Sequence, residues 1–89
     1  MRSVVYADKF VEDVAAIWSE RVLAELDRRL AALEAFPELG SSDVRPSLTA
    51  RFGPGLRKFP VATFVIVYRY VKDKDRLEFL ALPYGADVR

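Results

Sequence analysis

Apolar residues recur at helical spacing through the segment 9–36. They form two series, Phe10, Val14, Ile17 and Trp18 in the first and Leu23, Leu26, Leu30 and Leu33 in the second. Steps of three and four residues place each series on one face of an amphipathic helix. A single helix over 9–36 would be about 42 Å long, which is too long for a small domain. We therefore predict two antiparallel helices with a break near Ser19 and Glu20.

Local signals set the limits of this helical region. Ser3 to Tyr6 is short and β-branched, which predicts a strand before the helices. Asp8 is the predicted N-cap of the first helix. The second helix should end near Phe36, because Pro37 disfavours the helical conformation in the residue before it.

Apolar and β-branched residues dominate the second half of the chain, which indicates strands. Leu56 to Val61 leads through a Phe-Pro turn into a long strand that ends in Tyr-Arg, and the polar turn 72–75 precedes a strand from Leu77 to Leu82. By the period of two, Phe64, Ile66, Tyr68 and Tyr70 share one face of the long strand and Val65, Val67, Arg69 and Val71 share the other. We expect the aromatic face to meet the helices and the opposite face to line a groove.

Glycine and proline punctuate residues 37–55, which predicts a loop with a possible short strand at Leu48–Phe52. The whole order is β-α-α-β-β-β. We therefore predict one α+β domain over residues 1–89, an antiparallel sheet packed against a two-helix hairpin.

The amino-acid composition limits the catalytic and metal-binding groups that the chain can supply. The 89 residues include no cysteine and no histidine, which argues against a thiolate nucleophile and a soft metal site, and we expect no metal and no cofactor. Residues 1–43 carry five basic and nine acidic side chains and residues 44–89 carry nine basic and four acidic ones, which predicts an acidic helical side and a basic sheet side.

The distribution of apolar residues also predicts where the protein is located and whether it binds a partner. No apolar run approaches the roughly 18 residues of a membrane span, and no signal-peptide core follows the Met-Arg-Ser start, so we expect no membrane association and a cytoplasmic protein. Hydrophobic residues make up 52% of the chain. Apolar side chains that do not fit inside such a small core would be available to a partner.

The element order, the Leu-Arg-Lys-Phe-Pro-Val segment 56–61 and the Val-Ile-Val-Tyr-Arg segment 65–69 resemble the RelE/ParE toxin superfamily of bacterial type II toxin–antitoxin systems. The ParE branch is the more similar, because its members carry a Phe-Pro turn after an arginine and a Tyr-Arg strand end. The terminal His-Gly-Ala-Arg-like motif of that branch corresponds here to Tyr84-Gly85-Ala86-Asp87.

The resemblance implies a toxin of a plasmid stabilisation, or addiction, module that is neutralised by a cognate antitoxin. A ParE-like toxin would inhibit DNA gyrase and would not be an enzyme. A RelE-like toxin would instead be an endoribonuclease that cuts mRNA at the ribosome. A third alternative is a non-toxic member that binds a partner only, which the altered motif at 84–87 would explain.

The ribonuclease branch carries basic residues on the concave face of the sheet. Val65 and Leu56 stand in two of those slots and Lys58 in a third, so the set is incomplete and favours the gyrase-inhibiting alternative. If this toxin is nonetheless a ribonuclease, the candidate catalytic residues are Arg57, Lys58, Arg69 and Tyr84.

The same side chains are candidates for partner binding. Arg57 would contact gyrase, phosphate or the antitoxin, or would form an ion pair with a helix acid. Lys58 would point into the groove or into solvent, and Arg69 would occupy a half-exposed groove position. Tyr84 would act as a hydrogen-bonding or acid–base group or would pack. Trp18 would belong to the core, or to the surface that meets the antitoxin or a second copy in a homodimer.

Overall fold

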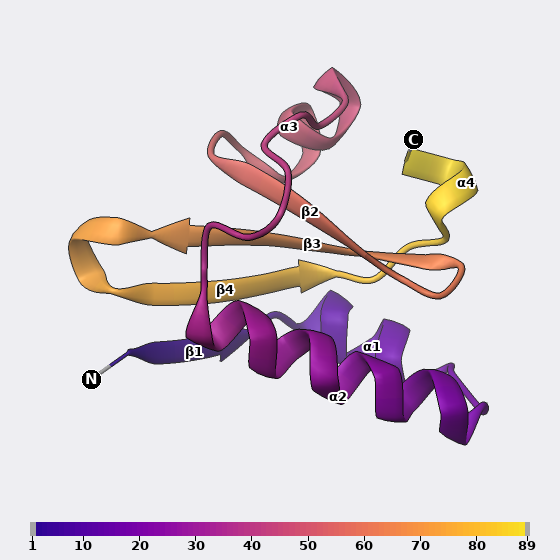
Figure 1. Cartoon of the computed structure of the whole chain (residues 1–89). Coiled ribbons are helices and arrows are strands. Elements are labelled where there is room, and N and C mark those ends of the chain that lie inside the picture. The colour runs from indigo at the N-terminus through magenta and orange to yellow at the C-terminus, as the bar shows by residue number, and fades with distance from the viewer. Residues whose placement is uncertain (1, 89) are drawn as a thin grey trace.

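The computed structural model describes residues 2–88, which form a four-stranded sheet with helices on both faces (Figure 1). The elements are β1 (Ser3–Tyr6), α1 (Asp8–Ala15), α2 (Glu20–Ala35), α3 (Pro46–Phe52), β2 (Leu56–Val61), β3 (Phe64–Val71), the 3₁₀ turn η1 (Lys72–Lys74), β4 (Arg76–Ala81) and α4 (Gly85–Val88). The predicted α+β class is confirmed. No helix within the described range is both long and apolar enough to span a membrane.

The sheet is mixed rather than wholly antiparallel, which corrects one expectation. Its strand order is β1-β4-β3-β2. The β2–β3 and β3–β4 pairs are antiparallel, as expected of strands joined by short turns, whereas β1 lies parallel to β4. Helices α1, α2 and α3 lie between β1 and the other three strands along the chain. A connection of this length allows β1 to lie parallel to β4.

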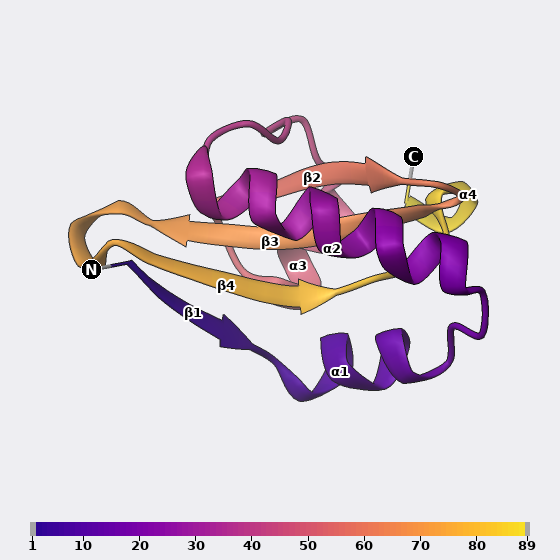
Figure 2. The ribbon, with the colours of Figure 1, turned by 60° about the horizontal axis from the view of Figure 1, so that its bottom comes forward.

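Helices α1 and α2 cover one face of the sheet and run in opposite directions (Figure 2). The predicted break is confirmed. Ser19 is the N-cap of α2, and its hydroxyl accepts a hydrogen bond from Val22 N at 3.3 Å. The predicted cap of α1 is displaced by one residue. Ala7 is the N-cap, and Asp8 is the first helical residue. A carboxylate at this position interacts favourably with the positive end of the helix dipole.

The segment Leu48–Phe52 belongs to helix α3 and forms no strand. Pro46 occupies the first turn of this helix, where its fixed φ suits the helix and its missing N–H costs no hydrogen bond. Gly53 ends the helix with a φ of 91°, a conformation that side-chain-bearing residues rarely adopt. Pro46 as a start signal and Gly53 as a stop signal thus delimit a short helix where a short strand was considered.

The main core lies between the sheet and helices α1 and α2. It is built from nine buried residues, namely Phe10, Leu26, Leu33, Val61, Ile66, Tyr68, Leu77, Phe79 and Leu82. The aromatic face of β3 meets the helices as predicted, since Ile66 and Tyr68 are buried there and Phe64 and Tyr70 pack against them.

A second core occupies the opposite face of the sheet, where a groove was expected. Helices α3 and α4 lie over this face (Figure 1). Its buried residues are Leu48, Leu56, Val65, Val67, Ala81 and Val88. A register shift between β3 and β4 sets Val67 opposite Ala81 and Tyr68 opposite Phe79. Strand β4 thus has one extra residue at Leu80, and this β-bulge lets Ala81 join the second core while Leu82 joins the first.

Candidate functional site

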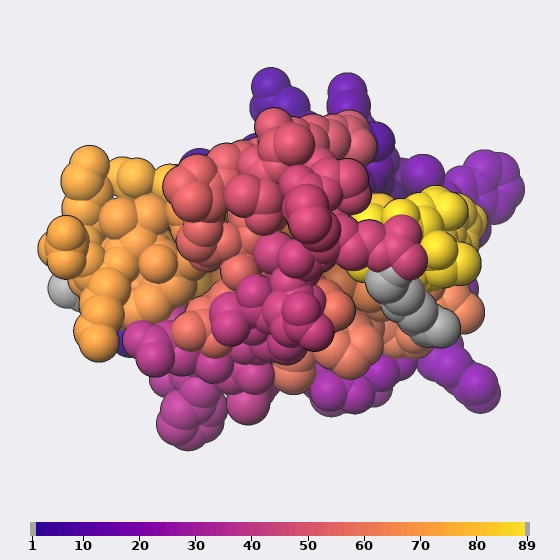
Figure 3. Space-filling view, turned by 90° about the horizontal axis from the view of Figure 1, so that it is seen from above, coloured from indigo at the N-terminus to yellow at the C-terminus, as the bar shows by residue number. Residues whose placement is uncertain are grey.

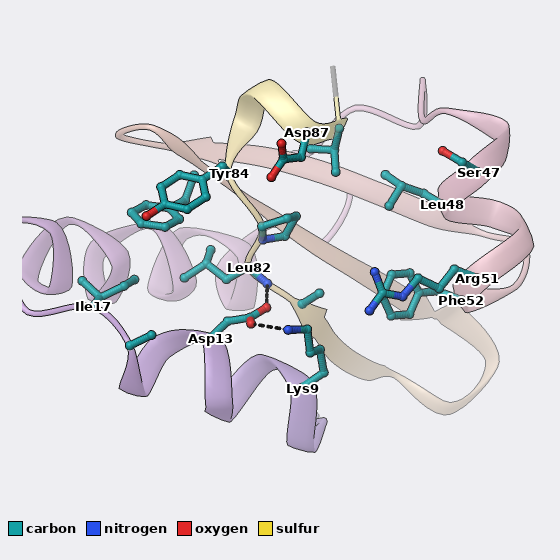
Figure 4. Close-up of a pocket in the computed structure, with 15 residues that line it drawn as sticks. Lys9, Asp13, Ile17, Ser47, Leu48, Arg51, Phe52, Leu82, Tyr84 and Asp87 are labelled. Carbon is teal, nitrogen blue, oxygen red and sulfur yellow. Dashed lines mark hydrogen bonds and ion pairs between the residues drawn. The ribbon is translucent and has the colours of Figure 1, made fainter.

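A cavity of about 460 Å³ lies where α1, α3 and α4 converge on the end of β4 (Figure 4). One wall comes from α1 and the turn after it, through Lys9, Asp13, Ala16 and Ile17, and the opposite wall comes from α3, through Ser47, Leu48, Arg51 and Phe52. Phe64 and the chain from Ala81 to Val88 complete it. This pocket, which we call the α1–α3–α4 pocket, combines an apolar lining with a few charged side chains, as ligand sites commonly do.

Two hydrogen bonds fix Asp13 in the wall of the pocket. Its Oδ1 accepts from Lys9 Nζ at 2.8 Å and its Oδ2 accepts from Leu82 N at 2.9 Å. Strand β1 ends before it could pair with this part of β4. The Asp13 carboxylate therefore satisfies a backbone donor that the sheet leaves unpaired.

Arg51 and Asp87 are the other charged groups of the pocket. The Arg51 guanidinium lies over the Phe52 ring, with its carbon 5.0 Å from the ring centroid. Within residues 2–88, neither Arg51 nor Asp87 has an oppositely charged partner at ion-pair distance. Both charges are thus available to groups that enter the pocket.

Tyr84 stands at the rim of the same pocket. Its ring stacks on Phe64 with centroids 4.8 Å apart, and 59% of the residue remains exposed. Backbone hydrogen bonds on either side hold it, from Val65 N to Pro83 O at 2.9 Å and from Gly85 N to Thr63 O at 2.7 Å. The side chain therefore packs on one ring face while the rest of the ring meets solvent.

Arg57, the candidate site residue before the Phe-Pro turn, binds main-chain oxygens. Its Nη1 donates to Gly40 O at 2.7 Å and to Glu38 O at 3.2 Å. Beside it, the buried Tyr68 hydroxyl donates to Pro37 O at 2.8 Å and accepts from Gly40 N at 2.9 Å. Burial raises the pKa of the Tyr68 hydroxyl. Together these contacts anchor the loop after α2 to the sheet, and no helix acid takes part.

Arg69 secures the end of α3. Its Nη1 forms an ion pair with Glu78 at 3.1 Å, its Nε donates to Pro54 O at 3.0 Å, and its Nη2 donates to Phe52 O. The guanidinium is thus partly buried and directed at α3 rather than into an open groove, because α3 covers this face.

Lys58 points to the face of β2 opposite Arg57, as the period of two requires. It lines a cavity of about 430 Å³ together with Leu39, Ser41, Val65 and Val88. Its backbone pairs with Ser41 through two hydrogen bonds of 2.9 Å each. The lysine therefore does face a hollow, but one with mainly apolar walls.

Trp18 is 92% exposed in the turn between α1 and α2, so it is not a core residue. An apolar groove of about 420 Å³ runs between these two helices and is lined by Tyr6, Phe10, Val11, Val14, Ala15, Leu23, Leu26, Asp27 and Leu30. We call it the α1–α2 groove. Val11, at its rim, is 54% exposed.

The predicted candidates do not converge. Lys58 and Tyr84 line two different cavities, and Arg57 and Arg69 hold backbone carbonyls. Arg51 was not among the predicted candidates, because it lies in the region 37–55 that was predicted to be a loop with a possible short strand at Leu48–Phe52. No group of three acidic, histidine or cysteine side chains within the described residues could hold a metal ion.

Solved structures of low sequence identity share this fold. A chain of the intact E. coli RelBE toxin–antitoxin complex matches with a TM-score of 0.68 and 12% identity, covering 96% of this chain and 98% of that one. YafQ from E. coli strain BL21(DE3) matches with a TM-score of 0.69 and 18% identity, covering 98% and 97%. A chain of the chromosomal ParDE toxin–antitoxin system from P. aeruginosa matches with a TM-score of 0.63 and 22% identity, covering 94% and 96%.

The sequence itself identifies the family. No curated protein matches it, but residues 4–88 match the family model described as the ParE toxin of the type II toxin–antitoxin system, parDE. That match covers every strand and helix described above except Ser3, the first residue of β1. The chain is therefore a member of the ParE toxin family, within the RelE/ParE superfamily of type II toxins.

Proposed function

We propose that this type II toxin inhibits DNA gyrase by binding it and cuts no RNA. The observation that carries the proposal is the second core. The sheet face on which the ribonuclease branch is expected to carry basic residues is here packed mainly with buried apolar side chains, and α3 and α4 cover it.

Leu56 and Val65, which stand in two of the basic slots, are both buried in the second core. Lys58 remains as a lone cation in the third slot. Cleavage at a ribose 2′-hydroxyl needs a base, an acid and cations around the phosphate. One lysine beside buried aliphatic side chains does not supply this set, and the sequence has no histidine.

The two arginine candidates are committed elsewhere. Arg57 and Arg69 each bind two main-chain oxygens, and Arg69 also pairs with Glu78. Withdrawing either guanidinium to contact a phosphate would break contacts that hold the loop after α2 or the end of α3. These contacts support structural roles for both residues.

An antitoxin is the second partner that we propose. The RelBE and ParDE structures that share this fold are toxin–antitoxin systems. Here the α1–α2 groove offers an apolar binding surface, and residues 1–43 carry an excess of acidic over basic side chains, nine against five. An antitoxin segment with apolar residues on one face and basic residues at its edges would fit this groove. Because both proposed partners are cytoplasmic, we also propose that the toxin acts in the cytoplasm.

Pulse labelling after induction of the toxin without antitoxin tests the proposal. We expect DNA synthesis to fall before protein synthesis, and we expect purified toxin to make gyrase accumulate cleaved plasmid DNA. An early fall in protein synthesis with cut transcripts would instead identify a ribonuclease. If neither synthesis changes, the non-toxic alternative with the altered motif at 84–87 would replace the proposal.

A further inference from the structure

We propose that the α1–α3–α4 pocket binds a guanine nucleoside monophosphate, with the base against Tyr84 and the phosphate between Arg51 and Lys9. This site goes beyond gyrase inhibition, since it is a small-molecule site within the toxin itself. Its volume of about 460 Å³ falls in the range of roughly 300–1,000 Å³ that small-ligand pockets occupy.

One end of the pocket is suited to a phosphate group. Figure 4 shows the Arg51 guanidinium extending from the α3 wall toward the α1 wall, where Lys9 lies with its ammonium directed at Asp13. Lys9 shares its charge with Asp13 at 2.8 Å, so the positive charge of Arg51 is the excess charge at this end. A guanidinium stacked on Phe52 presents its planar N–H groups in the geometry that binds phosphate oxygens through two parallel hydrogen bonds.

The other end is suited to an aromatic base that carries N–H donors. Tyr84 is backed by Phe64 on one ring face and is otherwise exposed, which makes it a stacking surface. Asp87 lies in α4, three residues after Tyr84, and its backbone N donates to Tyr84 O at 3.0 Å. Figure 4 shows both side chains in the wall of the pocket. A carboxylate accepts hydrogen bonds from adjacent N–H groups. Guanine carries two such groups side by side on its pairing edge, whereas adenine carries a donor beside an acceptor.

Isothermal titration of the full 89-residue toxin with GMP tests the site. We expect saturable one-to-one binding, and affinity about tenfold weaker for AMP because the paired donors are lost. Ribose 5-phosphate and guanosine each lack one of the two recognised groups and should bind more weakly still. Equal binding of ribose 5-phosphate and GMP would overturn the proposal and leave a simple anion site. The absence of saturable binding at millimolar GMP would overturn it altogether.

Matched variants locate the ligand. Arg51→Ala should weaken GMP binding about tenfold, while Arg45→Ala, which removes an exposed arginine from the start of the same helix and outside the pocket, should leave it unchanged. Tyr84→Leu keeps apolar packing on Phe64 but removes the stacking ring, and should also weaken binding. Circular dichroism establishes that each variant is folded. If a folded Arg51→Ala variant binds GMP as tightly as the wild type does, the proposal is wrong. Because no gyrase is present, failure here is independent of the toxin's target.

Discussion

The arginines of β2 and β3 use their guanidinium groups to bind main-chain carbonyls in this fold. Arg57 and Arg69 lie on opposite faces of the sheet, and both donate to carbonyl oxygens. The acceptors of Arg57 lie in the loop at 38–40, and those of Arg69 lie at the C-terminal end of α3 and just after it, at 52–54. Such segments have no ladder to satisfy their carbonyls, and a buried carbonyl without a donor is costly. The guanidinium, with five donors in a fixed plane, can serve several carbonyls at once.

Replacing Tyr68 by Phe tests the anchor beside Arg57. The change leaves Gly40 N without its acceptor and Pro37 O without its donor in a fully buried position, so we expect a loss of about 1–3 kcal/mol of unfolding free energy in urea. Tyr70→Phe is the control, because its hydroxyl donates to the half-exposed Asp75 and water can replace it. Equal losses in the two variants would contradict the anchoring role.

Asp75 gives the stability a pH dependence at the acid end. The pKa of its carboxyl lies below the usual 3.8, first because Arg2 Nε donates to it at 2.7 Å and next because the Tyr70 hydroxyl does so. A pKa that folding lowers contributes stability that is present above pH 3.8 and is lost as the pH falls through the folded pKa. Asp75→Asn should therefore lose less unfolding free energy than the wild type between about pH 5 and about pH 3. An Asp75→Asn variant with the same acid dependence as the wild type would contradict this role of the carboxyl.

Among the helices and strands, the spacing of apolar residues predicted the elements that have a single apolar face. The break at Ser19, the strand at Ser3–Tyr6 and the inward face of β3 all follow from spacing and caps, and all are confirmed. The second core was not predicted, because its cover comes from two short helices. Seven residues in α3 and four in α4 are too few to show a helical period. The bulge at Leu80 likewise leaves an uninterrupted apolar run in the sequence.

Arg69 should decide whether α3 stays on the sheet. Arg69→Ala removes the donors for Phe52 O and Pro54 O, and we expect faster amide hydrogen exchange in residues 46–55 with a stability loss of about 1–3 kcal/mol. Arg76→Ala also removes an ion pair with Glu78, at 2.8 Å, but touches no carbonyl of α3. Faster exchange of α3 in Arg76→Ala as well would show that the Glu78 charge network, rather than the carbonyl contacts, holds the helix.

The α1–α2 groove can be tested as the antitoxin seat with exposed apolar residues. Val11→Glu places a carboxylate on the apolar rim of this groove, which Asp27 also lines, and should weaken antitoxin binding about tenfold or more. Val5→Glu changes an apolar side chain of similar exposure, 46% against 54%, on β1 and outside the groove. Surface plasmon resonance with the antitoxin measures both. Unchanged affinity in a folded Val11→Glu variant would place the antitoxin elsewhere.

For the whole molecule, two cores on one small sheet leave little of the sheet open. Figure 3 shows the face over which α3 and α4 lie, where these segments and β2 cover much of the surface. Helices α1 and α2 take the other face and carry most of the acidic side chains of the first half. The surfaces left for partners are therefore the α1–α2 groove and the rims of the covering helices, rather than the strands themselves.

Val65→Arg distinguishes a covered sheet from an open catalytic face. A cation at this slot would suit an RNA-cleaving surface, but here Val65 is buried beneath α3 and α4 with Val67 and Ala81. The guanidinium would lose its hydration without gaining a partner, so we expect a loss of about 3–5 kcal/mol in urea unfolding. Val71→Arg places the same side chain on the same face of β3 at a half-exposed position, and should cost less than about 1 kcal/mol. If Val65→Arg is as stable as Val71→Arg, then α3 and α4 open readily and the face is accessible to substrate. That result would favour the ribonuclease alternative over gyrase inhibition, because the second core is the observation that separates them.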